Sequence, residues 1–173
     1  MSKKQRHSVA IVGTSHSLQV GLCGDSLAHE FTEFLSGVCD RVPIRAIAEE
    51  LSAEALVEKG RTTSLAMRVA QDRGLPHRLC DPSQRLRANL GIRQENDLAL
   101  SPGWKSLSQA QRTAHLKAED AKRERYWLEQ LRELDVWPVL FVCGAFHVSS
   151  FVAILGAAEI ASSVEILDWP VDI

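Results

Sequence analysis

Short runs of consecutive apolar residues alternate along the chain with longer segments in which apolar residues recur every three or four positions. The short runs predict buried strands, and the longer segments predict amphipathic helices. Strands are expected at residues 8–13, 43–48, 75–80, 137–143 and 164–167. Helices are expected at residues 26–38, 52–72, 117–134 and 147–157, with a further one opening at Asp81-Pro82.

This regular alternation of strands and helices predicts an α/β fold. We expect a single three-layer domain over residues 8–173, with a mostly parallel central sheet of about five strands flanked by helices. Residues 1–7 are expected to form a flexible N-terminal tail. Residues 93–125 are polar and contain few large apolar side chains, so we expect a mobile segment there.

Composition and charge narrow the classes of partner. The 173 residues are 45% hydrophobic, which suits one domain with its own core. Twenty Lys and Arg residues nearly balance 22 Asp and Glu residues, which argues against nucleic acid or an anionic membrane as partner. The four cysteines form no C-x-x-C pair and no signal peptide opens the chain, so we expect reduced cysteines and a cytoplasmic protein.

Residues 139–158 carry no formal charge and are long enough for a transmembrane helix. However, His147, Ser149 and Ser150 fall in the middle of this run. Its first residues are β-branched and aromatic, whereas its later ones have helical spacing. We therefore expect a buried strand, a turn at a glycine and a buried helix, and no membrane span.

Polar residues follow each of the first four predicted strands. They are His16, the pair Glu49 and Glu50, Asp81, and His147. In open α/β sheets, ligands bind beyond the carboxyl ends of the strands, so these side chains are expected at one edge. The ordinary alternative is that strand ends are polar because loops are exposed and helices need caps.

The two histidines share a local pattern, because each lies three residues after a glycine that closes an apolar strand. The pairs are Gly13 with His16 and Gly144 with His147. Glycine permits a sharp exit from a strand and close approach of another backbone. One Gly-x-x-His is a weak motif, but two at equivalent strand exits, with Glu49-Glu50 between them, are moderately specific.

This set of motifs resembles the Tiki superfamily, which includes TraB-like and GumN-type proteins, Tiki metalloproteases, erythromycin esterases and ChaN-like haem-binding proteins. The resemblance covers about residues 8–168 as an ordered series of short motifs. It places Glu49-Glu50 at the family's acidic pair and Arg123-Glu124 at its Arg-acidic helix, with Arg85 as a second candidate for the arginine. The expected catalytic residues are thus His16, Glu49, Glu50, Arg123 and His147, and the expected further binding residues are Asp81, Arg85 and Glu124.

Two mechanisms fit these residue types. In the first, which we favour slightly, His16, His147 and Glu50 hold a divalent metal ion (Mn, Co, Zn or Fe) that acidifies a bound water. In the second, no cofactor is needed, because a glutamate or histidine acts as general base while the other histidine and an arginine stabilise the oxyanion. Clustered carboxylates are expected to raise the pKa of one glutamate, as a base requires.

The sequence therefore predicts a hydrolase, metal-assisted in the first mechanism, that acts on an ester or amide of a small molecule or peptide. The alternative is a non-catalytic module that binds metal, haem or a small ligand through the same residues. So short a chain leaves two sources of substrate selection, which are the polar stretch 93–125 and the second subunit of a homodimer.

Residues 24–27 read Gly-Asp-Ser-Leu, which matches the nucleophile block of a class of serine esterases. That block should leave a buried strand, and a D-x-x-H motif should lie near the C-terminus. None of the six histidines ends such a motif, and the segment before Gly24 is not strand-like. We therefore expect Asp25 or Ser26 to cap a helix. Of the other histidines, His77 is expected to be structural.

Overall fold

The computed structural model describes residues 7–169, and all but the last residue of the expected N-terminal tail lies outside this range. The strands are β1 (Ser8–Thr14), β2 (Ala46–Glu49), β3 (His77–Leu79), β4 (Val139–Gly144) and β5 (Ala161–Ile166). The helices are α1 (His16–Gln19), α2 (Asp25–Arg41), α3 (Ala53–Glu58), α4 (Leu65–Asp72), α5 (Gln84–Asn89), α6 (Glu95–Ala99), α7 (Gln109–Leu134) and α8 (Val148–Ala157), with short 3₁₀ turns η1 (Trp104–Ser106) and η2 (Ala145–His147).

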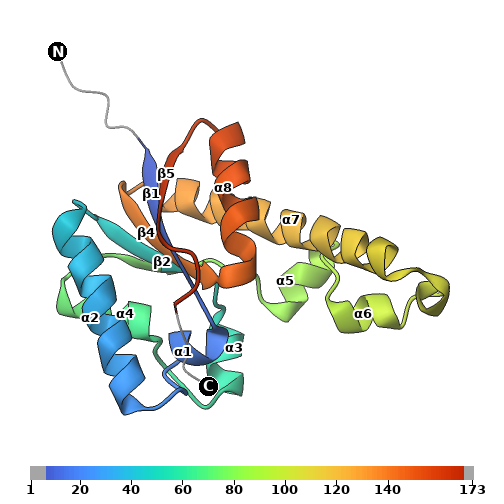
Figure 1. Ribbon diagram of the computed structural model, residues 1–173, viewed down its shortest axis with the longest axis horizontal. Coiled ribbons are helices and arrows are strands. Elements are labelled where there is room, and N and C mark those ends of the chain that lie inside the picture. The colour runs from blue at the N-terminus through green and yellow to red at the C-terminus, as the bar shows by residue number, and fades with distance from the viewer. Residues whose placement is uncertain (1–6, 170–173) are drawn as a thin grey trace.

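The five strands form one sheet in the order β3-β2-β4-β1-β5 (Figure 1). Every pairing is parallel, so the carboxyl ends of all strands lie at one edge. The central pair aligns Val9 of β1 with Val139 of β4 and Thr14 with Gly144. The expected α/β class and the single domain with about five strands are confirmed.

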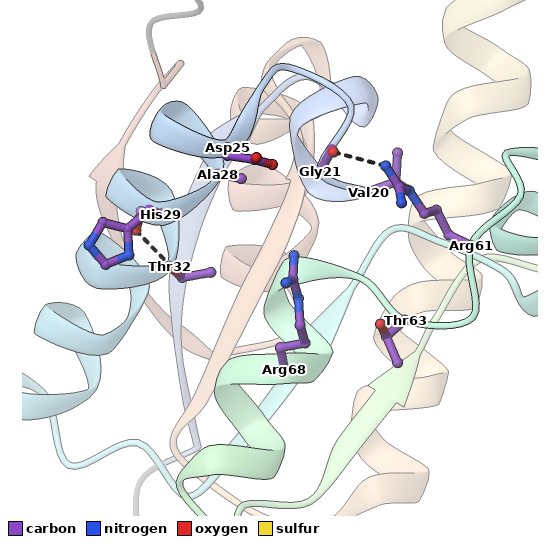
Figure 2. Close-up of a pocket in the computed structure, with 9 residues that line it drawn as sticks. All are labelled: Val20, Gly21, Asp25, Ala28, His29, Thr32, Arg61, Thr63 and Arg68. Atoms are coloured by element: carbon purple, nitrogen blue, oxygen red, sulfur yellow. Dashed lines mark hydrogen bonds between the residues drawn. The ribbon is translucent and has the colours of Figure 1, made fainter.

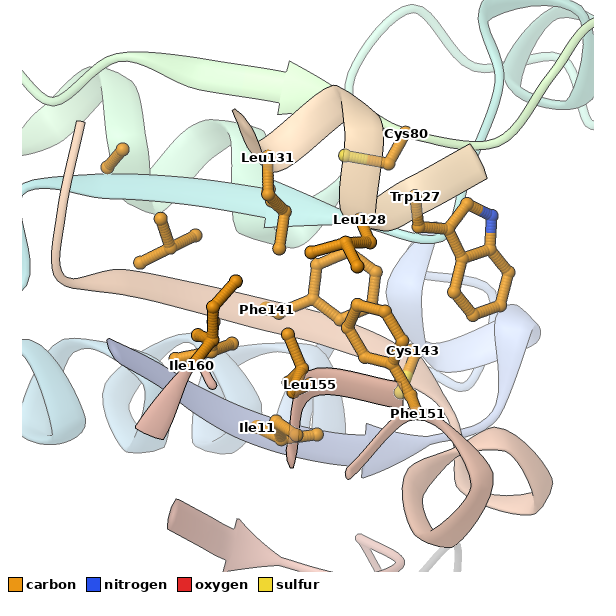
Figure 3. Close-up of a cluster of buried hydrophobic side chains, with 14 of the residues drawn as sticks. Ile11, Cys80, Trp127, Leu128, Leu131, Phe141, Cys143, Phe151, Leu155 and Ile160 are labelled. Carbon is orange, nitrogen blue, oxygen red and sulfur yellow. The ribbon is translucent and has the colours of Figure 1, made fainter. Parts of the chain in front are cut away.

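Helices cover both faces of the sheet. Alternate residues of a strand point to opposite faces, so Val9 and Ile11 of β1 pack on the side of α7 and α8, whereas Ala10 and Val12 pack on the side of α2 and α4. Figure 3 shows the first of these two cores, in which Trp127 of α7 contacts Phe141 of β4 and Phe151 of α8. The same alternation directs the adjacent residues Glu49 and Glu50, at the end of β2, to opposite faces of the sheet.

The helix expected over residues 52–72 is wrong in one respect, because it is broken into α3 and α4. Ser52 caps α3 as expected, with its hydroxyl accepting from the Ala55 N–H at 3.1 Å. Gly60 then adopts a left-handed conformation (φ +66°), which turns the chain, and Ser64 caps a new helix. The break places Ser64 next to Glu49, the last residue of β2.

The polar stretch 93–125 is largely helical. It contains α6 and η1, and α7 begins at Gln109, eight residues before the expected start at Lys117. A reciprocal pair of hydrogen bonds between Ser108 and Gln111 caps α7, which explains a start among polar residues. Strand β5 also starts earlier than expected, since exposed residues 161–163 pair with β1 through their backbone alone.

The uncharged run at residues 139–158 folds as β4, η2, α8 and the residue that follows. This is the strand, turn and helix that the change of composition within the run predicts. In the part of the chain that the structure describes, there is no helix long and apolar enough to cross a membrane.

Candidate functional site

Two short turns at the carboxyl edge of the sheet position the histidines. After β1, Ser15 caps α1 by accepting from the Leu18 N–H at 3.2 Å, and His16 is the first residue of that helix. After β4, turn η2 ends at His147, immediately before α8. Because β1 and β4 are neighbours in the sheet, both imidazoles reach the same edge.

The Glu50 carboxylate lies between the two imidazoles and is buried (1% exposed). Its Oε1 lies 3.4 Å from His16 Nε2, 3.5 Å from His147 Nε2 and 2.9 Å from Arg123 Nη2. Its Oε2 accepts from the Gly144 N–H at 2.7 Å. One buried carboxylate thus connects both Gly-x-x-His motifs and the arginine of α7.

The pKa of Glu50 is lowered from 4.5 to about 2. Burial by itself raises it, but the hydrogen bond from His16 and the positive charges of His147 and Arg123 outweigh that effect. Clustered carboxylates were expected to raise one glutamate's pKa. For Glu50 this expectation is wrong, because cationic groups surround its carboxylate. Glu50 is therefore a permanent anion near neutral pH and a weak base.

The guanidinium of Arg123 is fixed by a second carboxylate and by an aromatic ring. Asp81 Oδ1 accepts from Arg123 Nε at 3.2 Å and from Nη2 at 3.1 Å. The same oxygen accepts from Trp127 Nε1 at 3.1 Å, and the guanidinium lies 5.4 Å from the centre of that indole ring. Trp127 therefore packs in the hydrophobic core and also donates a hydrogen bond to Asp81 of the polar site.

His147 is held between two carboxylates. Its Nδ1 lies 2.8 Å from Glu124 Oε1, which also accepts from the Ser150 hydroxyl at 2.6 Å. Burial lowers the pKa of His147, but the hydrogen bond to Glu124 and the charge of Glu50 outweigh this and raise it. Among charged neighbours, Arg123 opposes the rise and Asp120 supports it. His147 is therefore more readily protonated than an ordinary histidine.

These groups open into a cavity of about 530 Å³. Sequence reasoning missed six charged residues that line it, which are Lys59, Arg87, Arg93, Glu95, Glu119 and Asp120. Burial and the nearby carboxylates of Glu124 and Glu50 raise the pKa of Asp120, against the opposing charges of His147 and Arg123. Asp120 lies three residues before Arg123 on α7, so helical spacing from that arginine could have identified it.

Of the residues predicted from sequence, the structure brings His16, Glu50, Asp81, Arg123 and His147 together around the cavity. Glu124 lies behind His147 and does not line the cavity. Phe146, almost fully exposed, lines both this cavity and an adjoining one of about 440 Å³.

Glu49 does not join its neighbour Glu50. It is the last residue of β2 and shares the parity of Ile47, so it points to the α2 and α4 face. There its Oε1 accepts from the Ser64 hydroxyl and lies 2.8 Å from His77 Nε2. This placement is a correction to the predicted catalytic set, and it gives His77 the structural contact that was expected.

Arg85 also stays outside the site. It is exposed on α5 and is not among the residues that line the cavity. Residues two apart on a helix point in different directions, and it is Arg87 that pairs with Asp81. Of the two candidate arginines, the structure therefore brings only Arg123 to Glu50.

The donor set around Glu50 does not fit a divalent metal ion. The glutamate oxygen that both Nε2 atoms face is the one that Arg123 contacts at 2.9 Å, so a metal there would meet a fixed positive charge. Over residues 7–169, no group of three or more His, Cys, Asp or Glu side chains is arranged to hold a metal.

The Gly-Asp-Ser-Leu segment lies elsewhere. The Ser26 hydroxyl donates to Glu30, one turn later on α2, at 3.0 Å, and neither residue lines the cavity that holds the histidines. The expectation that Asp25 or Ser26 caps this helix is wrong, because Gly24 is the N-cap and makes no side-chain capping hydrogen bond, while Asp25 is the first residue of α2.

The resemblance to the Tiki superfamily stays a prediction. Comparison of the chain with protein-family models, with curated proteins and with solved structures finds no match.

Proposed function

We propose that the chain hydrolyses an ester or amide bond with its two histidines, and that the protein's own side chains suffice for the chemistry. One observation carries this proposal: two imidazoles and a guanidinium converge on a single buried carboxylate oxygen, Glu50 Oε1, at the wall of a cavity of about 530 Å³. General acid–base catalysis requires paired titratable groups held in this way.

His16 is the general base in this proposal. Its Nε2 lies 3.4 Å from Glu50 Oε1, so we assign the proton to Nε2, which leaves the lone pair on Nδ1. Its side chain is 47% exposed, so water can reach the ring. Nδ1 takes a proton from water as the water oxygen attacks the substrate carbonyl carbon.

His147 and Arg123 act on the other side of the reaction. Arg123 keeps its positive charge because Asp81 and Glu50 raise its pKa despite burial, and it stabilises the oxyanion that attack creates. His147, with its raised pKa, donates a proton to the leaving oxygen or nitrogen as the bond from the carbonyl carbon breaks. The proton that His16 took balances the one that His147 gave.

Turnover of a panel of nitrophenyl esters and peptide amides tests the function. His16→Ala and His147→Ala are each expected to lower kcat/KM by at least about 100-fold, the usual contribution of a general acid or base. The matched control is His115→Ala, at an exposed histidine of α7 outside the cavity, which should leave kcat/KM unchanged. Equal rates in the site variants and the control would contradict the proposal.

The alternative, binding without turnover, is supported by the ion pairs of the site. Glu50, Asp81, Arg123 and His147 all have partners already, as expected of a rigid binding pocket. A ligand that raises Tm in proportion to its concentration, while no substrate of the panel is hydrolysed, would favour this function.

The proposed role of His147 predicts an alkaline limb in the pH profile. A general acid works only while protonated, so kcat/KM should fall as the pH rises through the His147 pKa, which is raised above 6.5. Glu124→Gln removes the hydrogen-bonded charge that raises this pKa, and the limb should move to lower pH. A limb that stays in place in Glu124→Gln would show that another group supplies the proton.

Chelation tests the metal-free chemistry. Treatment with EDTA followed by gel filtration is expected to leave kcat/KM and Tm unchanged, because the Arg123 guanidinium rather than a metal ion neutralises Glu50. Adding Mn²⁺, Co²⁺ or Zn²⁺ should have no activating effect. Loss of activity on chelation, with recovery on adding one of these ions, would restore the metal-assisted mechanism.

A further inference from the structure

A second cavity, of about 410 Å³, shares no lining residue with the histidine site (Figure 2). It is bounded by the turn after α1, the first turns of α2, the loop between α3 and α4, and α4 itself. Its wall is more polar than apolar and includes two arginines, Arg61 and Arg68. The hydrolase proposal uses none of these residues.

Both guanidinium groups lie against the same glycine. Arg61 Nη2 donates to the Gly21 carbonyl at 3.2 Å. Arg68 also lies close to this residue, since a Cβ built on Gly21 would lie 3.4 Å from Arg68 Nη2. Figure 2 shows the Arg68 side chain extending from α4 toward the turn that carries Gly21, with Arg61 approaching from the neighbouring loop.

No carboxylate in the described part of the chain forms an ion pair with either arginine. Within residues 7–169, Arg61 makes only its bond to the Gly21 carbonyl, and Arg68 makes no hydrogen bond or ion pair. By contrast, Arg73, at the end of the same helix as Arg68, pairs with Asp40 at 2.8 Å. Two like charges directed to one hollow repel each other, and a bound dianion would remove that repulsion.

The other polar groups of the wall indicate what accompanies the anion. The hydroxyl of Thr63 can donate to an oxyanion. The Asp25 carboxylate lines the same cavity and is a hydrogen-bond acceptor, so it suits a ligand hydroxyl. Guanidinium forks match the geometry of phosphate oxygens, and two of them match its double charge.

We propose that this cavity binds a small phosphate monoester, with Arg61 and Arg68 holding the phosphate and Asp25 accepting a hydrogen bond from a hydroxyl of the same molecule. The site is independent of the hydrolytic function, so either proposal can fail without the other.

Calorimetric titration with glycerol 3-phosphate and with inorganic phosphate tests the site. Both are expected to bind, and Arg61→Gln or Arg68→Gln should each weaken binding by about tenfold or more, the loss expected for one charge-assisted hydrogen bond. Arg85→Gln, at an exposed arginine of α5 outside this cavity, is the matched control and should bind as the unchanged protein does.

Asp25→Asn distinguishes recognition of the phosphate group from recognition of the ligand hydroxyl. It removes a negative charge from the wall, so inorganic phosphate should bind more tightly, while the preference for glycerol 3-phosphate over inorganic phosphate should shrink. Absence of binding by either probe would overturn the proposal. So would equal weakening in Arg85→Gln, or binding of acetate as tight as that of phosphate.

Discussion

Glu50→Gln is expected to lower the free energy of unfolding at pH 7 by roughly 3 kcal/mol, and kcat/KM by about 1000-fold or more. The stability loss follows from the lowered pKa, since ionised Glu50 is stabilised by the folded protein relative to the unfolded chain. The activity loss follows because the Glu50 charge orients His16, faces His147 and pairs with Arg123.

The pH dependence of this loss has a definite sign. A carboxylate whose folded pKa is about 2, against an ordinary value of 4.5, contributes stability above pH 4.5 and loses it as the pH falls toward 2. The difference between the unchanged protein and Glu50→Gln should therefore shrink by roughly 1 kcal/mol between pH 7 and pH 3.5. Urea unfolding at both pH values measures it.

Two further variants are the controls for Glu50→Gln. Glu58→Gln, at an exposed position of α3, should change neither stability nor activity. Glu50→Asp keeps the charge but withdraws it from the imidazoles, so it should retain more stability than Glu50→Gln while remaining inactive. A Glu50→Gln protein as stable at pH 7 as the unchanged protein would show that the buried charge is not a stabilising element.

The fold could be predicted from sequence because its strands are continuous apolar runs and its helices have one apolar face. The position of the site at the carboxyl edge of the sheet could be predicted because parallel strands end at the same edge. What periodicity did not predict is the exact end of β2. The apolar run stops at Ala48, whereas strand pairing continues through Glu49. Only the observed strand therefore shows that Glu49 and Glu50 point to opposite faces of the sheet.

The two Gly-x-x-His motifs show the same limit. They were expected at equivalent strand exits, but the register pairs Gly144 with Thr14, so the motifs are offset by one residue. Arg123 was found through the resemblance alone, since its partners Glu50 and Asp81 are 73 and 42 residues away in the chain. Contacts over such separations leave no periodic signal in one sequence.

The one-residue offset gives the two glycines different tasks, which a matched pair of alanine substitutions should separate. A Cβ at Gly13 would lie 1.9 Å from the Leu167 carbonyl oxygen and 2.7 Å from Val148 Cγ2. The segment after β5 crosses Gly13 there, and the Trp169 N–H donates to the Gly13 carbonyl at 2.8 Å. Gly13→Ala is expected to cost roughly 3 kcal/mol or more, because a backbone segment cannot move aside as a side chain can.

A Cβ at Gly144 meets the site instead of the backbone. It would lie 3.2 Å from Glu50 Oε2, 3.5 Å from His147 Cδ2 and 3.6 Å from His16 Nε2. The φ of Gly144 is −59°, which alanine adopts without strain. Gly144→Ala should therefore destabilise by less than about 1 kcal/mol, while it displaces the carboxylate that both imidazoles face and lowers kcat/KM.

Urea unfolding and kcat/KM for the two variants, compared with Gly156→Ala, measure the difference between the glycines. Gly156 is an exposed helical position in α8 where an added Cβ meets no atom of residues 7–169 within 4 Å, so alanine should stabilise the protein by about 0.5–1 kcal/mol. The same substitution thus has three expected outcomes, which are loss of stability at Gly13, loss of activity at Gly144 and a gain of stability at Gly156. Equal stability losses at Gly13 and Gly144 would show that both glycines serve strand packing, and the assignment of Gly144 to the site would then be wrong.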